Sequence, residues 1–247
     1  MSRGVYVRLR RLFFHHLRHL RGNSFATVNQ NCVFNLLSLV IFEGKIIHPL
    51  SQLRYFVLHK PYGYLSQFTP EEAGQLTLAD LGPFPPDVYP IGRLDQDSEG
   101  LLLLSNDAKL NVKLLDPRHA HWRTYWVQVE GNPSAEALQQ LRSGVDIRIN
   151  KKTHHTIPAQ AKVLQPQPNI AERNPPIRYR ANIPETWLEL SLQEGKNRQV
   201  RRMCAKVGFP VLRLLRVKIE NLELGELPLG AHQEYSQSEI YQALKIK

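Results

Sequence analysis

Three acidic side chains stand in a short, turn-rich stretch that runs directly into four leucines. Asp95, Asp97 and Glu99 alternate along residues 92–100, and the leucine run 101–104 follows. This run is too short for an isolated helix and predicts a strand buried on both faces. A loop that leads into a buried strand is held rigidly, so the acids lie where catalytic groups are usually mounted.

The acidic stretch has three interpretations. The first is a solvated turn, in which Gly100 supplies a positive φ angle. The second is a calcium-binding loop, which we reject because the twelfth position falls on Asn106 instead of a bidentate glutamate and no helical pattern precedes the loop. In the third, one aspartate acts as a nucleophile or base, which requires a cationic partner and a cleft of substrate size.

The composition indicates a globular protein with a polyanionic partner. The 247 residues are 42% hydrophobic and carry a net charge of +10, enough for a core in one domain or two packed halves. Residues 1–42 hold six arginines and no acid, so the rest of the chain is only mildly basic. Cys32 and Cys204 are the only cysteines, and their number and spacing fit a reducing compartment.

Residues 1–50 differ in composition from everything that follows. They are basic and histidine-rich, then polar, then apolar over residues 32–42, a run too short to cross a bilayer. The acid-free, arginine-rich character of residues 1–42 is compatible with an organellar transit peptide or with a start codon upstream of the true one. We expect residues 1–50 to be an extension whose composition permits disorder, and residues 51–240 to form the folded domain.

Beyond Arg54 the hydrophobic pattern indicates an α+β fold. Strands are predicted over residues 55–59, 101–104, 123–130, 157–164 and 187–193, with a strand pair or bent strand in 212–224. Helices are predicted after a cap at Asn106 or Asp107, after Ser134 and after Asn197. Strands and helices do not alternate regularly, which disfavours a doubly wound sheet. The proline-rich loop 165–184 is too long for a simple connector, so we expect it to contact something.

The helix after Asn197 is predicted to have one apolar and one cationic face. The cationic side chains are those of Arg198, Arg201, Arg202 and Lys206. Such a face is ordinarily solvated, but positive charge at a helix start opposes the macrodipole. We therefore expect an anion nearby, either a phosphate backbone or a buried carboxylate. A nucleotide phosphate loop is excluded because the required glycine and hydroxyl residue are missing around Gly195–Lys196.

The aromatic side chains offer a candidate for stacking on a base, whereas the histidines offer no metal site. Tyr125 and Trp126 share a predicted strand, ordinarily as core or interface aromatics, although in a basic cleft an aromatic ring can stack on an extruded base for roughly 1 to 3 kcal/mol. The histidines show no metal-ligand spacing and are expected on the surface, namely His119, His121, His154 and His155.

These motifs, in this order, resemble the RNA pseudouridine synthases of the RsuA branch. The matching segments are 92–95, 97–102, Tyr125 and 195–203. Residues 173–178, 183–184 and 187–188 are similar to a subgroup that modifies 23S (large-subunit) ribosomal RNA. The resemblance covers about residues 54–235 and implies a pseudouridine synthase fold: a mixed, mostly antiparallel sheet in two packed halves with a central RNA-binding cleft. The S4 RNA-binding domain common in this branch has no match in residues 1–50.

The resemblance implies an isomerase that detaches a uracil from its ribose nitrogen link, rotates it and rejoins it through carbon. Asp95 would be the nucleophile, paired with Arg201, whose charge lowers a carboxylate pKa by roughly 1 to 3 units. Tyr125 would stack on the uracil and assist proton removal. Arg93 would fill the space left by the flipped nucleotide, and Leu212 is a weaker candidate for packing beneath the base.

A paired base must be flipped out before it reacts, which costs a few kcal/mol. Stacking and phosphate contacts would offset this cost, and the expected phosphate-binding residues are Lys60, Lys196, Arg198 and Arg202. The resemblance implies no metal and no cofactor. We expect ribosomal RNA as the partner, no membrane, a monomer and a cytoplasmic location in a bacterium, while organellar targeting by residues 1–50 stays open.

Two other functions fit the same residues. A glycosylase could use an aspartate beside an N-glycosidic bond and let water complete the reaction. A non-catalytic binder or assembly factor for ribosomal RNA is suggested by the basic helix face. Attack on the base and attack on the sugar both stay open, as does the target uridine.

Overall fold

The computed structural model describes residues 40–42, 45–47, 52–177, 180 and 183–247. The chain divides into two units, Met1–Gln52 and Leu53–Lys247. In the first unit, strands β1 (Val40–Phe42) and β2 (Lys45–Ile47) pair antiparallel. Most of the extension predicted for residues 1–50 lies outside the described residues. No helix of the described part is long and apolar enough to span a membrane.

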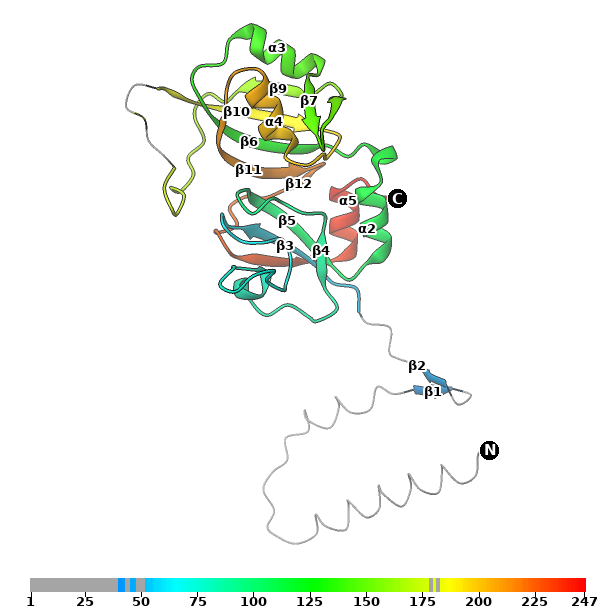
Figure 1. Cartoon of the computed structure of the whole chain (residues 1–247). Helices are drawn as coiled ribbons and strands as arrows, with labels where there is room; N and C mark the ends of the chain where they lie inside the picture. Colours follow the sequence, from blue (N-terminus) through cyan, green and yellow to red (C-terminus); the bar gives the residue numbers. More distant parts are fainter. Residues whose placement is uncertain (1–39, 43–44, 48–51, 178–179, 181–182) are drawn as a thin grey trace, which may run out of the picture. The chain divides into compact units, whose positions relative to one another are not determined.

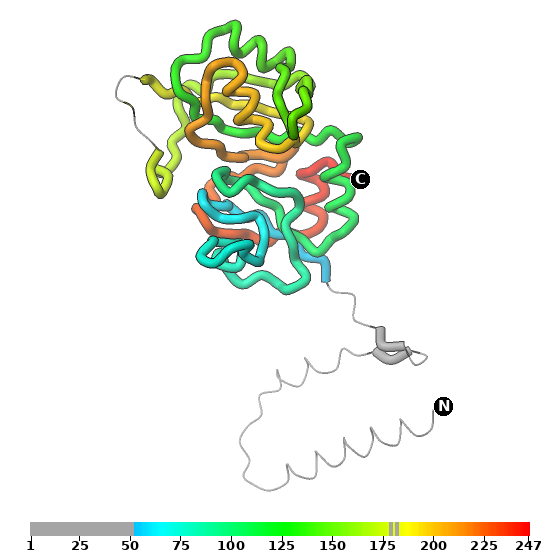
Figure 2. The backbone as a smooth tube through the Cα atoms, viewed as in Figure 1, coloured from blue at the N-terminus to red at the C-terminus, as the bar shows by residue number. Residues whose placement is uncertain are grey.

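A nine-stranded sheet runs through the second unit (Figure 1, Figure 2). Its strands are β3 (Tyr55–Lys60), β4 (Tyr89–Ile91), β5 (Glu99–Ser105), β6 (Arg123–Glu130), β9 (Gln160–Val163), β10 (Glu185–Leu192), β11 (Val211–Ile219), β12 (Leu222–Glu223) and β13 (His232–Tyr235). The order is β13-β3-β5-β11-β6-β10-β9, with β12 beside β11 and β4 beside β5. Only the β5–β11 pairing is parallel among those described. The predicted α+β class and mostly antiparallel mixed sheet are confirmed.

Helices lie against each half of the sheet. α2 (Ala108–Leu115) and α5 (Gln237–Ala243) lie beside β3, β4 and β5, whereas α3 (Ala135–Ser143) and α4 (Gln199–Lys206) lie beside the other half (Figure 1). The predicted caps are confirmed, since the Asp107 carboxylate accepts from the amides of Lys109 and Leu110 and the Ser134 hydroxyl from that of Ala137. Short 3₁₀ turns, η3 (Leu78–Leu81) and η4 (Pro117–His119), complete the helical elements described.

The leucine run forms the centre of β5 and is buried on both faces, as predicted. Leu101 and Leu103 pack in a cluster with α2 and α5, and Leu102 and Leu104 pack in a second cluster with Phe56. All four leucines have 0% exposure. Because successive strand side chains point to opposite faces, one four-residue run joins two separate cores.

The two halves of the sheet meet where β5 runs parallel to β11. The register pairs are Glu99 with Leu215 and Gly100 with Arg216. Gly100 has φ +104°, and a Cβ there would lie 2.2 Å from the Arg216 carbonyl oxygen. Beside it, Arg213 binds Glu99 through two bonds of 2.8 Å, both side chains being buried. This junction fixes the acidic loop against β11.

Several elements, β4 among them, were not predicted. β7 (Asp146–Ile149) and β8 (Lys152–His155) form a hairpin whose turn residues, Asn150 and Lys151, both have positive φ. β13 and α5 close the chain, and α5 begins at a capping box formed by Ser236 and Glu239. The capping box was legible in the sequence, whereas a two-residue hairpin turn without glycine has no clear signal.

The proline-rich loop makes the contacts that its length predicted. The Arg173 guanidinium lies 4.1 Å from the centre of the Tyr62 ring, and the Ala171 carbonyl accepts a bond of 2.7 Å from Arg213. The loop is therefore attached to the turn after β3 and to β11.

Candidate active site

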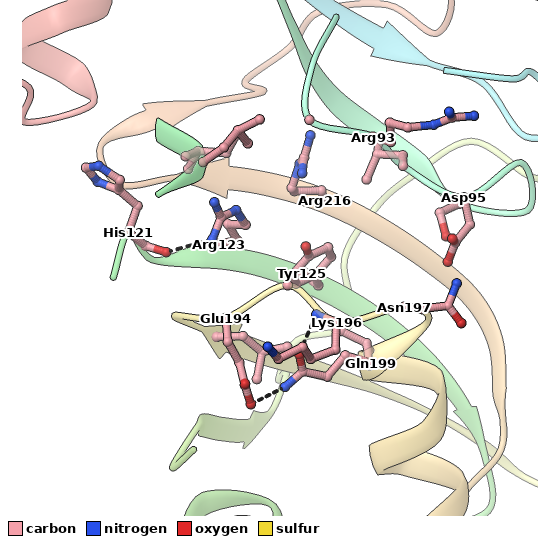
Figure 3. A pocket seen from close by; sticks show the side chains of 18 of the residues that line it. Arg93, Asp95, His121, Arg123, Tyr125, Glu194, Lys196, Asn197, Gln199 and Arg216 are labelled. Atoms are coloured by element: carbon pink, nitrogen blue, oxygen red, sulfur yellow. Dashed lines mark hydrogen bonds between the residues drawn. The ribbon is translucent and has the colours of Figure 1, made fainter. Parts of the chain in front are cut away.

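A cavity of about 680 Å³ opens where the two halves of the sheet meet (Figure 3). Its floor comes from β6 and β11, where Tyr125 faces Arg216 across the strands and Leu214 lies two residues along. One wall is the acidic loop with Asp95, and another is the segment before α4 with Lys196. A cavity of this size accommodates a small organic group and part of its attached chain.

Hydrogen bonds to its backbone hold the acidic loop on both sides. The Ser66 hydroxyl bonds both the amide and the carbonyl of Leu94, at 3.1 and 2.9 Å. Gly63 donates its amide to the Gln96 carbonyl at 2.8 Å, and the Ser98 amide closes the turn on the Asp95 carbonyl at 3.0 Å. The loop is therefore preorganised, as a loop that bears a catalytic group must be.

The structure assigns the three acids to three environments. Asp95 lines the cavity, with its side chain 34% exposed. Asp97 is bound by arginines from α4 and the residue before it, and Glu99 is buried against Arg213. The solvated-turn interpretation is wrong for Asp97 and Glu99. Asp95 alone among the three lines the cavity.

The predicted pairing of Arg201 with Asp95 is wrong. Arg201 places Nε 3.3 Å from the Asp97 carboxylate and donates Nη2 to the Asp97 carbonyl at 2.6 Å. Arg198 binds the Asp97 carboxylate with two bonds of 2.9 and 2.7 Å, and its Nη1 lies 3.7 Å from Asp95 Oδ2. Asp97 is thus the anion that the arginines at the start of α4 required, and Arg198 is the cation that reaches Asp95.

Burial and charge compete at this cluster. Burial raises the pKa of Asp97, but the hydrogen bonds and charges of Arg198 and Arg201 outweigh it and leave that pKa below its usual value. Burial lowers the pKa of Arg201, and the Asp97 carboxylate opposes that change. Asp97 therefore stays an anion that orients both arginines beside Asp95.

Lys60 is not placed to contact a phosphate, contrary to the prediction. It has 0% exposure, and its ammonium donates to the carbonyls of Pro61 and Ser98 at 3.0 and 2.8 Å. Burial lowers the pKa of Lys60 to about 8, with partial opposition from Glu99 and the two aspartates. Lys60 instead links the end of β3 to the acidic loop.

A lysine with a lowered pKa makes stability depend on pH. Between pH 8 and 10.5 the unfolded chain binds the proton that folded Lys60 has lost, so unfolding free energy rises with pH in that window. Relative to Lys60→Met, wild type should gain roughly 3 kcal/mol across it. Urea titrations of both proteins at pH 7.5, 9 and 10.5 measure the gain. Parallel pH curves for the two proteins would contradict this prediction.

Arg202 and Leu212 both lie outside the cavity lining. Arg202 donates to the Asn197 carbonyl and side chain and to the Arg148 carbonyl, and its contact with an RNA phosphate stays a prediction. Leu214 lines the cavity whereas Leu212 does not, and the packing of Leu212 beneath the base stays a prediction. One histidine is not where the sequence predicts it. His121 is not on the surface: it is 8% exposed, with Nδ1 3.4 Å from Glu220.

Arg93 and Lys196 lie at the cavity, and their roles stay predictions. Arg93 is exposed and donates Nη2 to the Gln67 side chain at 2.8 Å. Lys196 is exposed on the opposite wall, and its ammonium makes no ion pair with the described residues. Within the described part of the chain, no group of three histidine, cysteine or acidic side chains could hold a metal ion.

Two cavity residues escaped the sequence analysis. Arg123 and Arg216 lie on the same floor as Tyr125 (Figure 3). Because alternate residues of a strand share one face of the sheet, the sequence could have placed Arg123 on the same face as Tyr125, two residues later. Arg216 follows a register shift in β11, so alternation alone does not place it.

The chain is similar to known proteins in both sequence and fold. Residues 54–206 match the family described as RNA pseudouridylate synthase. The chain is 53% identical over 172 residues to ribosomal large subunit pseudouridine synthase E of Xanthomonas axonopodis pv. citri, covering 69% of this chain and 88% of that protein. It is 49% identical over 185 residues to the protein of the same name from Vibrio parahaemolyticus, covering 75% of each. A crystal structure of a pseudouridylate synthase matches with a TM-score of 0.64 at 26% identity, covering 82% of this chain and 78% of that one.

Proposed function

Because the chain belongs to the RNA pseudouridylate synthase family, whose reaction is an isomerisation, we propose that it converts a specific uridine of large-subunit ribosomal RNA into pseudouridine. The relatives named above, at about half identity over most of their length, support this substrate. The observation that carries the proposal is the position of Asp95, which lines the cavity beside Tyr125 while its two acidic neighbours are bound by arginines.

The chemistry proposed for the site needs a flipped uridine in the cavity. Asp95 attacks the nucleotide and forms a covalent bond with it, the link between ribose and N1 breaks, and the uracil rotates. The uracil then rejoins the ribose through C5, and the bond to Asp95 breaks to release the free carboxylate. C5 loses its proton with the help of Tyr125, and N1 gains one, so the product is an isomer of the substrate. Leu214, 5% exposed, forms the apolar surface next to that ring. The Arg198 guanidinium lies 3.7 Å from the Asp95 carboxylate, which is the attacking group.

Mapping pseudouridines in ribosomal RNA tests the proposal. Cells with and without the gene should differ at one large-subunit uridine, and purified protein should restore that modification on RNA from the deficient cells. Identical maps together with a failure to modify that RNA in vitro would reject the proposal. The rival glycosylase function predicts free uracil in stoichiometric amounts, which the same reaction mixture reveals by chromatography.

Lys196 is proposed to contact the RNA backbone, since its exposed ammonium faces the cavity. Lys196→Ala should weaken binding and reduce the slope of log affinity against log salt by about 0.7 to 0.9. The matched control is Lys206→Ala, an exposed lysine of α4 outside the cavity lining, which should leave the slope unchanged. Filter binding at several salt concentrations measures both. An unaltered slope for Lys196→Ala would remove this contact.

We also propose that the protein acts as a monomer in the bacterial cytoplasm. The bacterial relatives support the compartment, because ribosomal RNA is located there. Sedimentation analysis with and without RNA tests the monomer, and fractionation of cells that express the full chain tests the compartment.

A further inference from the structure

β11 carries two buried arginines, of which one has a carboxylate partner among the described residues and the other has none. Arg213 is 6% exposed and is neutralised by Glu99 through two bonds of 2.8 Å. Arg216 is 4% exposed and forms no ion pair with the described residues. Its Nε donates to the Leu101 carbonyl at 2.8 Å, and its buried Nη2 has no hydrogen-bond partner among them.

A second arginine on the same cavity floor also makes no ion pair with a carboxylate of the described residues. Arg123 donates Nη1 to the His121 carbonyl at 3.2 Å and Nη2 to the Leu114 carbonyl at 3.0 Å, near the end of α2. Burial lowers the pKa of Arg216 and the charge of Arg123 lowers it further, while the electrostatic interaction and side-chain hydrogen bond with Tyr125 oppose this change. The two guanidinium groups therefore repel one another in the free protein.

Two adjacent cations without an acid form an unfavourable arrangement. A buried charge left unpaired is strongly destabilising, and an orphaned donor loses the hydrogen bonds that water would give it. Both costs disappear when an anion with several acceptor oxygens enters the cavity, since a guanidinium group binds such an anion through parallel hydrogen bonds. Resting on the proposed function, the anion that enters with a flipped uridine is a phosphate group of the RNA chain.

We propose that Arg123 and Arg216 form a phosphate-binding subsite that holds a phosphate adjoining the extruded uridine. Arg216 supplies the buried Nη2, and Arg123 supplies a second charge that also ties the subsite to the end of α2. Because Arg216 faces Tyr125 across β6 and β11, a phosphate bound there would fix its nucleotide beside that ring. The subsite would thus position the nucleotide, while Asp95 attacks it.

The alternative is a purely structural role, in which the two arginines only hold the carbonyls of Leu101 and Leu114. Binding of uridine 3′,5′-bisphosphate and of uridine, measured by NMR titration, separates the two roles. Wild type should bind the bisphosphate at least about tenfold more tightly than uridine. Arg216→Met and Arg123→Gln should bring this ratio close to one. The control Arg142→Gln, which loses a bond to the Ala161 carbonyl outside the cavity lining, should keep the wild-type ratio.

The substituted side chains are buried to different extents, so the test can be completed even if the most buried variant fails to fold. Arg123 is only partly buried, and Arg216→Lys keeps the charge, so both should fold even where Arg216→Met does not. Arg216→Lys keeps the charge but loses the parallel hydrogen bonds, so it should show a preference for the bisphosphate between those of wild type and Arg216→Met. A ratio near one in wild type, or a wild-type ratio in Arg123→Gln, would overturn the subsite. Since nucleotide binding is measured without turnover, a failure of the subsite is distinguishable from a failure to form pseudouridine in ribosomal RNA.

Discussion

Asp95→Asn should abolish pseudouridine formation, by about four orders of magnitude or more, while RNA affinity stays within a few fold. The asparagine keeps the size of the side chain but cannot act as the nucleophile. Asp95 lines the cavity, and its only ion-pair distance with a described residue is 3.7 Å, to Arg198, so little structure depends on its charge. Single-turnover assays on deficient ribosomal RNA and filter binding measure the two quantities.

The neighbouring acid provides the matched comparison. The Asp97 carboxylate holds both Arg198 and Arg201, so Asp97→Asn loosens the cluster without removing the reacting group. We expect it to lower the rate by about 10²-fold through misplacement of the site. Normal turnover by Asp95→Asn would show that Asp95 is not the nucleophile. If Asp97→Asn were then inactive, the nucleophile would be Asp97.

Much of the fold was predictable because local signals and burial agree. The run 101–104 reads as a doubly buried strand, and the caps at Asp107 and Ser134 begin the helices that follow. The hairpin of β7 and β8 was missed because its turn uses Asn150 and Lys151 in left-handed conformations that sequence usually signals with glycine. Strand pairing across more than a hundred residues, as between β5 and β11, is likewise absent from any local pattern.

The site was predictable in its members more than in its contacts. Sequence spacing and family resemblance brought Asp95, Tyr125 and Arg201 together, but neither says which of two aspartates an arginine reaches. The two hydrogen bonds from Arg198 to the Asp97 carboxylate decide this point, and they depend on how α4 is placed against the acidic loop. Lys60 was assigned to RNA because of its charge, whereas the packing of β3 buries it. Charge predicts a partner only when exposure is known.

Both the fold and the site depend on one close backbone contact. β5 and β11 join through Gly100 and Arg216, and this junction carries the acidic loop on one strand and the cavity floor on the other. A side chain at position 100 would meet backbone, with Arg216 oxygen at 2.2 Å and nitrogen at 2.7 Å from the added Cβ. Backbone atoms cannot swing aside as the end of a flexible side chain can.

Gly100→Ala should therefore destabilise the protein by more than about 4 kcal/mol, by forcing the two strands apart and straining a φ of +104°. Two other glycines separate these causes. Gly208 has φ +97° with nothing within 4 Å of an added Cβ, so Gly208→Ala should cost only about 1 to 2 kcal/mol of strain. Gly195 has neither constraint, and Gly195→Ala should stay within about 0.5 kcal/mol of wild type. Urea unfolding ranks the three, and a cost for Gly100→Ala no larger than that for Gly208→Ala would mean that the junction is not closed by this contact.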